Sequence, residues 1–193
     1  MTMPVCLRRR THVVIAFVLG AAITTPLSAA DIYKARMLTG KAPVEPATIA
    51  ISVEVQEYTT PEEVARLQEA LNEPGMDAFL TAFKSMKKGV VRILDTRGWN
   101  LPIHAAQVIP TDKGTKLQCF LVREAWNQET QMIRSKDYFM VLELNLDEKG
   151  RGEGRLYQDA GIDLRLREGR LEMSRFGAPP KMIVQVRTEK KKS

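Results

Sequence analysis

The stretch Leu146–Leu156, LDEKGRGEGRL, has the residue types of a binding loop, because glycines at positions 150, 152 and 154 alternate with charged side chains. A calcium loop starting at Asp147 would place Lys149 and Arg151 where oxygen ligands are needed. A phosphate loop would end in GK[ST] and lead into a helix, whereas this stretch leads into a strand-like pattern. The composition of the loop therefore argues against both metal and phosphate binding.

A β-hairpin explains the same stretch better. Asp147 and Gly150 stand first and fourth in DEKG, the pattern of a type I turn followed by a left-handed glycine. This turn fixes a register in which opposite charges and apolar residues meet across the strands. It pairs Glu143 with Arg155, Leu142 with Leu156, Leu146 with Gly152 and Leu144 with Gly154. The two glycines thus lie on the apolar face, where either a helix or a ligand packs against them.

Other candidates for chemistry are few. His104 lies in a strand-like segment and is a weak candidate for a catalytic base, because a lone histidine in such a strand is usually structural. Cys119 alternates with Leu117 and Leu121, which is typical of a buried thiol. Beyond residue 30 these are the only histidine and the only cysteine, too few for a zinc site of Cys and His ligands. We expect no metal site and no cofactor.

One loop collects charged and aromatic residues that could line a binding rim. Two segments, LVREAW and IRSKDY, bracket it. The candidate binding residues are Arg123, Glu124, Trp126, Arg134, Asp137 and Tyr138. An ordinary cluster of salt bridges in a loop is the alternative interpretation.

The elements that must position these residues begin after an export signal. Residues 1–30 contain three arginines, an apolar run from Val13 to about Thr24, and small residues up to Ala30. This is the plan of a secretory signal peptide. About 12 apolar residues are too few to span a bilayer, which takes roughly 20. We expect cleavage near Ala30, a periplasmic or secreted location, and no transmembrane segment in the mature chain.

Removal of residues 1–30 lowers the formal charge from +6 to +3, because it takes away three arginines and no acid. Much of the remaining charge lies in the tail, residues 189–193, with Lys190, Lys191 and Lys192. The folded part is close to neutral and offers no basic surface for nucleic acid.

The remaining pattern predicts one domain over residues 47–188, preceded by a loose lead-in over 31–46. Residues 47–56 alternate like a half-buried strand. Thr60, Pro61 and Glu63 predict a helix start with a capping box, and a second helix follows over about 76–86. The apolar stripes of both helices, which include Met and Phe, indicate core packing.

From Gly89 onward the chain is strand-like. Strands are predicted at about 89–94, 99–109, 115–124, 137–146, 152–167, 170–176 and 181–188, with a bend near Gly161. Short connections favour antiparallel neighbours. The predicted fold is α+β and mainly antiparallel β: a curled meander sheet, either a partial barrel or a sandwich, with two helices after the first strand.

The segments YTTPEEVARLQEAL and RSKDYFMVLELNLDEKGRGEGRL resemble an uncharacterised family of secreted bacterial proteins over most of the mature chain. The resemblance lies in helix-cap and hairpin residues. It implies export and a single domain, and it brings no catalytic residue.

These observations favour a non-catalytic envelope or secreted binding module. Its ligand would be apolar or amphiphilic and held between the curled sheet and the helices, or its partner would be another envelope component. One alternative is a periplasmic hydrolase that uses carboxylates and arginine, with His104 as a possible base. The other is a structural partner-binding protein, for which a large exposed apolar patch would speak.

Overall fold

The computed structural model describes residues 30–39, 47–74, 77–94, 99–122, 139–160, 164–167, 170–173 and 179–189. The strands are β1 Asp31–Leu38, β2 Thr48–Val55, β3 Gly89–Ile93, β4 Trp99–Thr111, β5 Gly114–Val122, β6 Phe139–Leu146, β7 Arg151–Ala160, β8 Leu164–Arg167, β9 Arg170–Met173 and β10 Lys181–Glu189. The helices, α1 Pro61–Asn72 and α2 Asp77–Ser85, lie between β2 and β3.

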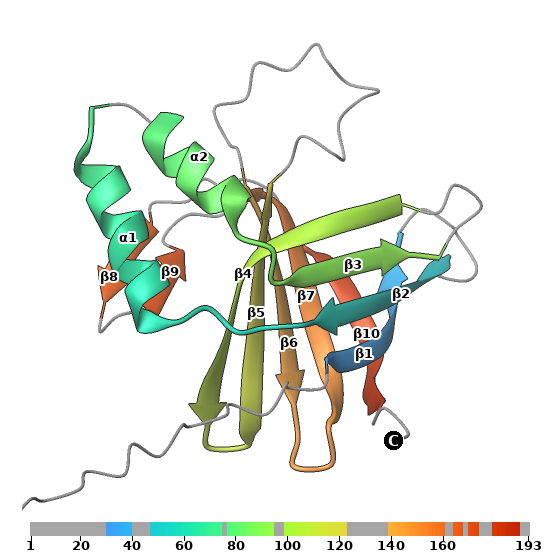
Figure 1. Cartoon of the computed structure of the whole chain (residues 1–193). Helices are drawn as coiled ribbons and strands as arrows, with labels where there is room; N and C mark the ends of the chain where they lie inside the picture. Colours follow the sequence, from blue (N-terminus) through green and yellow to red (C-terminus); the bar gives the residue numbers. More distant parts are fainter. Residues whose placement is uncertain are drawn as a thin grey trace, which may run out of the picture.

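Eight of the strands form a closed antiparallel barrel in the order β1-β10-β7-β6-β5-β4-β3-β2, and β2 pairs back with β1 (Figure 1). β8 and β9 form a separate two-stranded sheet. The predicted antiparallel sheet with two helices is confirmed, and the sheet closes fully where a partial barrel or a sandwich was expected. Closure removes the unpaired edges that an open sheet would carry.

Strand β1 makes this closure, and the prediction of a loose lead-in over 31–46 was wrong for residues 31–38. β1 pairs with β2 along one edge and with β10 along the other. Tyr33, Ala35 and Met37 point into the barrel and are buried. The alternation is weak in the sequence, because Asp31 shares the register of Tyr33 and the apolar Ile32 and Leu38 share that of Lys34 and Arg36.

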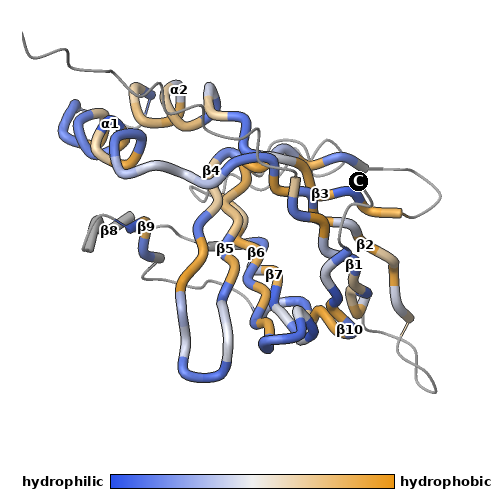
Figure 2. The backbone as a smooth tube through the Cα atoms, turned by 60° about the horizontal axis from the view of Figure 1, so that its bottom comes forward, coloured by the Kyte–Doolittle hydropathy of each residue, from blue (hydrophilic) through white to orange (hydrophobic). Residues whose placement is uncertain are grey.

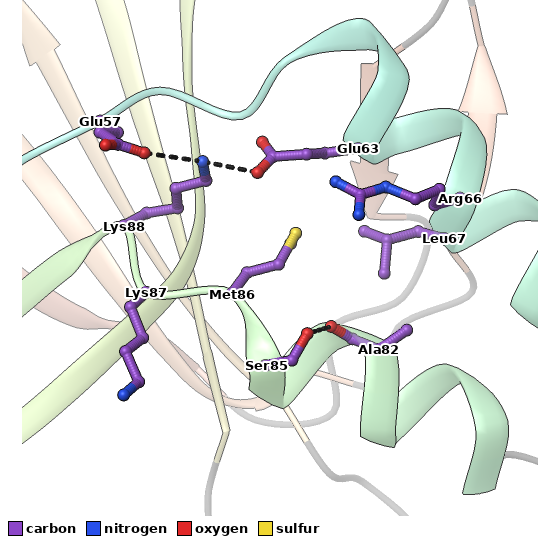
Figure 3. Close-up of a pocket in the computed structure, with 9 residues that line it drawn as sticks. All are labelled: Glu57, Glu63, Arg66, Leu67, Ala82, Ser85, Met86, Lys87 and Lys88. Carbon is purple, nitrogen blue, oxygen red and sulfur yellow. Dashed lines mark hydrogen bonds and ion pairs between the residues drawn. The ribbon is translucent and has the colours of Figure 1, made fainter.

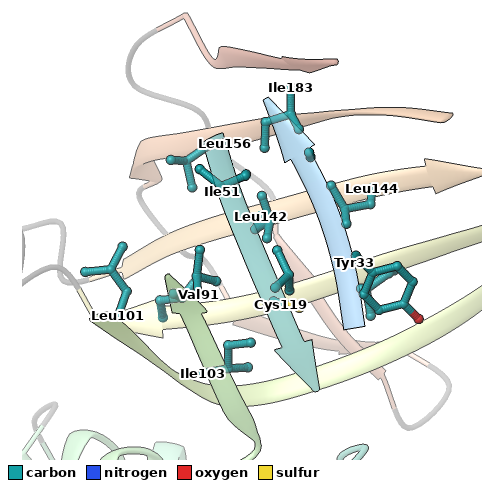
Figure 4. Close-up of a cluster of buried hydrophobic side chains, with 14 of the residues drawn as sticks. Tyr33, Ile51, Val91, Leu101, Ile103, Cys119, Leu142, Leu144, Leu156 and Ile183 are labelled. Atoms are coloured by element: carbon teal, nitrogen blue, oxygen red, sulfur yellow. The ribbon is translucent and has the colours of Figure 1, made fainter. Parts of the chain in front are cut away.

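The inside of the barrel is filled by aliphatic side chains that point toward one another from opposite walls (Figure 4). The 21 buried residues of this cluster are each 0–8% exposed. Eight strands give an interior just wide enough to be filled in this way. Along the tube in Figure 2, hydrophilic residues gather at the hairpin between β4 and β5.

A second core lies outside the barrel, where α1, α2 and β9 cover the outer face of β4 to β7. Phe79 and Phe83 of α2 are fully buried there and pack against Phe139 of β6, with ring centroids 5.3–5.8 Å apart. The Phe stripe predicted for the second helix is therefore core packing. None of the described helices combines the length and the apolar character needed to cross a bilayer.

The side chain of Gln107 holds the β8–β9 hairpin on this face, because it bonds the main chain of β9 as a neighbouring strand would. The amide of Gln107 on β4 donates to the carbonyl of Leu171 at 2.8 Å and accepts from its N–H at 3.2 Å. It also donates to Gln118 of β5 at 2.7 Å. Because Leu171 is buried, its main-chain groups depend on Gln107 for these bonds.

Gln107→Ala should therefore lower the free energy of unfolding by about 2 kcal/mol, because it leaves a buried N–H and a buried C=O without these partners. Hydrogen exchange at the Leu171 amide should accelerate more than exchange in the barrel strands. Asn100→Ala, at an exposed position on the same strand, is the control. Unchanged exchange at Leu171 would show that Gln107 does not hold the hairpin.

Candidate functional site

The LDEKGRGEGRL stretch is a hairpin turn, as the sequence predicted. Gly150 has a left-handed φ of 70°, and its N–H donates to the carbonyl of Asp147 at 2.9 Å. The Asp147 carboxylate accepts from the N–H groups of Lys149 and Arg151 at 2.9 and 2.8 Å. All four cross-strand pairs expected from this register are present between β6 and β7. The carboxylate of Asp147 shapes the turn.

The long strand predicted over 152–167 divides near its expected bend, since β7 ends at Ala160 and β8 begins at Leu164. The six predicted rim residues, Arg123, Glu124, Trp126, Arg134, Asp137 and Tyr138, lie outside the described residues. The ends of the two strands that flank them are neighbours, because Val122 pairs with Phe139.

His104 lies on the outer wall of the barrel beneath α2. The register of β4 shifts between Ile103 and Ala105, so Ile103 faces the interior while His104 packs against Phe83 at a centroid distance of 5.4 Å. Its Nδ1 lies 3.0 Å from the carbonyl oxygen of Met86, to which it donates. With 7% of its surface exposed, His104 anchors the end of α2 to the barrel.

A pocket of about 270 Å³ opens between α1, α2 and the chain segment that enters α1 (Figure 3). It combines an apolar part with an ionic part. Leu67, Ala82 and Met86 form the apolar part, with Ser85 beside them. Glu57, Glu63, Arg66, Lys87 and Lys88 form the ionic part. His104 does not line it.

Lys88 is the centre of the ionic part. Its ammonium lies 2.7 Å from a carboxylate oxygen of Glu63 and 3.3 Å from one of Glu57, and its side chain is only 4% exposed. Its backbone is also fixed: the N–H donates to Ile103, and the carbonyl accepts from Gln56 and Glu57. A buried cation needs such partners, because removing a charge from water is costly.

Glu63 performs two tasks with one carboxylate. One oxygen accepts from the N–H of Thr60 at 2.9 Å, while the N–H of Glu63 donates to the Thr60 hydroxyl, which completes the predicted capping box. The other oxygen pairs with Lys88. Partial burial raises the pKa of Glu63. The hydrogen bonds from Lys88 and from the Thr60 N–H, together with the charges of Lys88 and Arg66, lower the pKa by more, so the net shift is downward.

Residues 56–60 form a strap that carries Glu57 to the pocket. Thr59 binds Ala106 of β4 twice, through its N–H and through its hydroxyl. The Tyr58 hydroxyl donates to the Asp31 carboxylate at 2.6 Å and lies 3.4 Å from the hydroxyl of Tyr33. Burial and the bond to Asp31 raise the pKa of Tyr58, so it stays protonated and keeps this bond. Glu57 therefore extends from a fixed backbone.

Sequence reasoning found Glu63 as a helix cap and Lys88 as a cation after a helix end, but it placed neither in a site. No local pattern shows that Lys88 points inward, because its partners are 25 and 31 residues away. Within the described part of the chain, His, Cys, Asp and Glu side chains form no group of three that could hold a metal ion. Cys119 is fully buried inside the barrel, and burial raises the pKa of its thiol.

Comparisons with protein-family models, with curated proteins and with solved structures found no match to this chain. The family resemblance of its cap and hairpin residues remains a prediction.

Proposed function

We propose that this chain is an exported, non-catalytic binding module that holds a small amphiphile in the pocket between α1 and α2. The observation that carries the proposal is the composition of the pocket, in which an apolar part lies directly beside five ionisable side chains. A ligand with a short apolar chain and a polar head matches both parts. Most ligand pockets have a mainly apolar lining. Here six of the nine lining residues are polar or ionisable, so the polar head would make most of the contacts.

The packing of the two cores supports this location. Buried side chains of the described residues pack inside the barrel and also between the barrel and the helices, where the sequence had suggested a ligand. We therefore place the proposed site in the pocket between α1 and α2. A volume of about 270 Å³ lies just below the roughly 300–1,000 Å³ of typical ligand pockets, which suits a small ligand.

The position of His104 favours binding over hydrolysis, because its ring lies under α2 and outside the pocket. A partner-binding apolar face has less support among the described residues. Their exposed large hydrophobic side chains are Leu94, Val108 and Met182. Leu94 follows β3 and lies near the Trp99 end of β4. Val108 is nine residues further along β4, roughly 30 Å away, and Met182 is on β10.

Native mass spectrometry of protein purified from the periplasm tests the proposal. We expect a retained small molecule in the wild type and its loss in Ala82→Trp, because the indole fills the pocket. Thr81→Trp adds the same bulk at the neighbouring exposed position and should keep the molecule. Wild-type protein free of any small molecule, or equal retention in both variants, would contradict a ligand at this site.

A further inference from the structure

The two carboxylates that pair with Lys88 are held very differently. Glu63 makes the shorter contact, its side chain is 16% exposed, and its second oxygen is fixed by the helix cap. Glu57 makes the longer contact, and its side chain is 71% exposed. When Glu57 leaves Lys88 its carboxylate stays well solvated, and the buried ammonium keeps its shorter contact with Glu63, so the separation costs little. Glu57 is therefore the partner that Lys88 can exchange at low cost.

The charges around the pocket favour an anion in that place. Arg66, Lys87 and Lys88 are cationic, while Glu57 and Glu63 are anionic. If Glu57 turns into solvent, one carboxylate remains against the cations Arg66 and Lys88, while the side chain of Lys87 extends away from the pocket (Figure 3). A lysine ammonium has three donors, so an incoming carboxylate can bind Lys88 while Glu63 stays in place. A cationic head group would have to compete with Lys88 for Glu63.

From this arrangement we infer that the ligand of the proposed pocket carries an anionic head group, which replaces Glu57 on Lys88 while its apolar chain lies against Leu67, Ala82 and Met86. The inference rests on the proposed function and adds the charge of the ligand. Glu57 acts in it as a displaceable counter-ion that keeps Lys88 paired when the pocket holds no ligand.

Three unbranched probes with eight carbon atoms each separate the possibilities: octanoate, 1-octanol and octylammonium. We expect octanoate to bind most tightly in calorimetric titrations and to shift NMR signals of the pocket residues. Its affinity should fall as salt is added, since the attraction is screened. Octanol should bind more weakly, and octylammonium should bind weakest.

Substitution of Glu57 gives the sharper test. Glu57→Gln removes the competing charge and should tighten octanoate binding about two- to fivefold, the range that corresponds to an exposed ion pair. Glu73→Gln removes an exposed charge beyond the end of α1, away from the pocket, and should leave the affinity nearly unchanged. Glu57 is exposed, so its variant should fold normally.

The outcomes distinguish this inference from the proposed function. Equal binding of octanoate and octanol in the pocket, or weaker octanoate binding by Glu57→Gln, would overturn the anionic head group and leave an amphiphile site intact. No signal shift at the pocket with any of the three probes would overturn both.

Discussion

Gly152→Ala is expected to destabilise the protein by about 3 kcal/mol, although glycine to alanine in a strand usually stabilises. A Cβ at Gly152 would overlap the carbonyl oxygen of Asn145 on β6, well inside the 3.0 Å that real Cβ contacts keep. The obstacle is backbone in a closed barrel, so it cannot move aside as a flexible side chain would. For a domain of this size, the melting temperature should fall by roughly 6–12 °C.

Glu153→Ala is the matched control, because this residue is the next one along β7 and points outward to solvent. It should change the melting temperature little, as surface substitutions usually do. Gly154→Ala should resemble Gly152→Ala, since its Cβ would meet the carbonyl oxygen of Glu143. Thermal unfolding followed by circular dichroism measures all three variants. A stabilised Gly152→Ala variant would show that β6 can shift away from β7.

These glycines show how far the sequence could predict the fold. The turn residues Asp147 and Gly150 fixed the hairpin register, and that register placed Gly152 and Gly154 on the inward face. What fills the space beside them could not be read from local pattern. The neighbouring strand itself fills that space, with its backbone at Gly152 and with its backbone and the Leu144 side chain at Gly154.

The strands that local pattern marks well are those with clear turn signals at both ends. β1 lacks such a signal at its start, and its short alternation is interrupted by Ile32 and Leu38, so its role became visible only through its partners β2 and β10. A barrel differs from an open sheet by this one pairing between distant segments. Turn residues carry no information about it.

The candidate site, like the barrel, could be predicted from local sequence only in part. Local chemistry marked Glu63, because a glutamate three residues after a capping threonine has a defined partner. The tertiary fold supplied the rest: the segment between α2 and β3 places Lys88 beside Glu63, and the strap brings Glu57 to the same ammonium. One residue thus carries both a predictable cap and an unpredictable ion pair.

Glu63→Gln separates these two tasks, because glutamine can still cap α1 but cannot neutralise Lys88. The buried ammonium would then keep only the exposed Glu57 as a charged partner. We expect a loss of about 2–3 kcal/mol at pH 7, below the 3–5 kcal/mol of a fully buried pair, because solvent still reaches Glu63. Glu69→Gln, at an exposed position on the same helix, should have little effect.

The contribution of Glu63 to the free energy of unfolding should depend on pH. The pKa of Glu63 in the folded protein lies below its ordinary value of 4.5, so its ionised form stabilises the fold above that pH. The contribution is lost as the pH falls through the folded pKa. Wild type and Glu63→Gln should therefore differ at pH 7 and converge in acid, as measured by urea unfolding at several pH values. A difference that persists in acid would instead come from the packing of the side chain, and Lys88 would then not depend on the Glu63 charge.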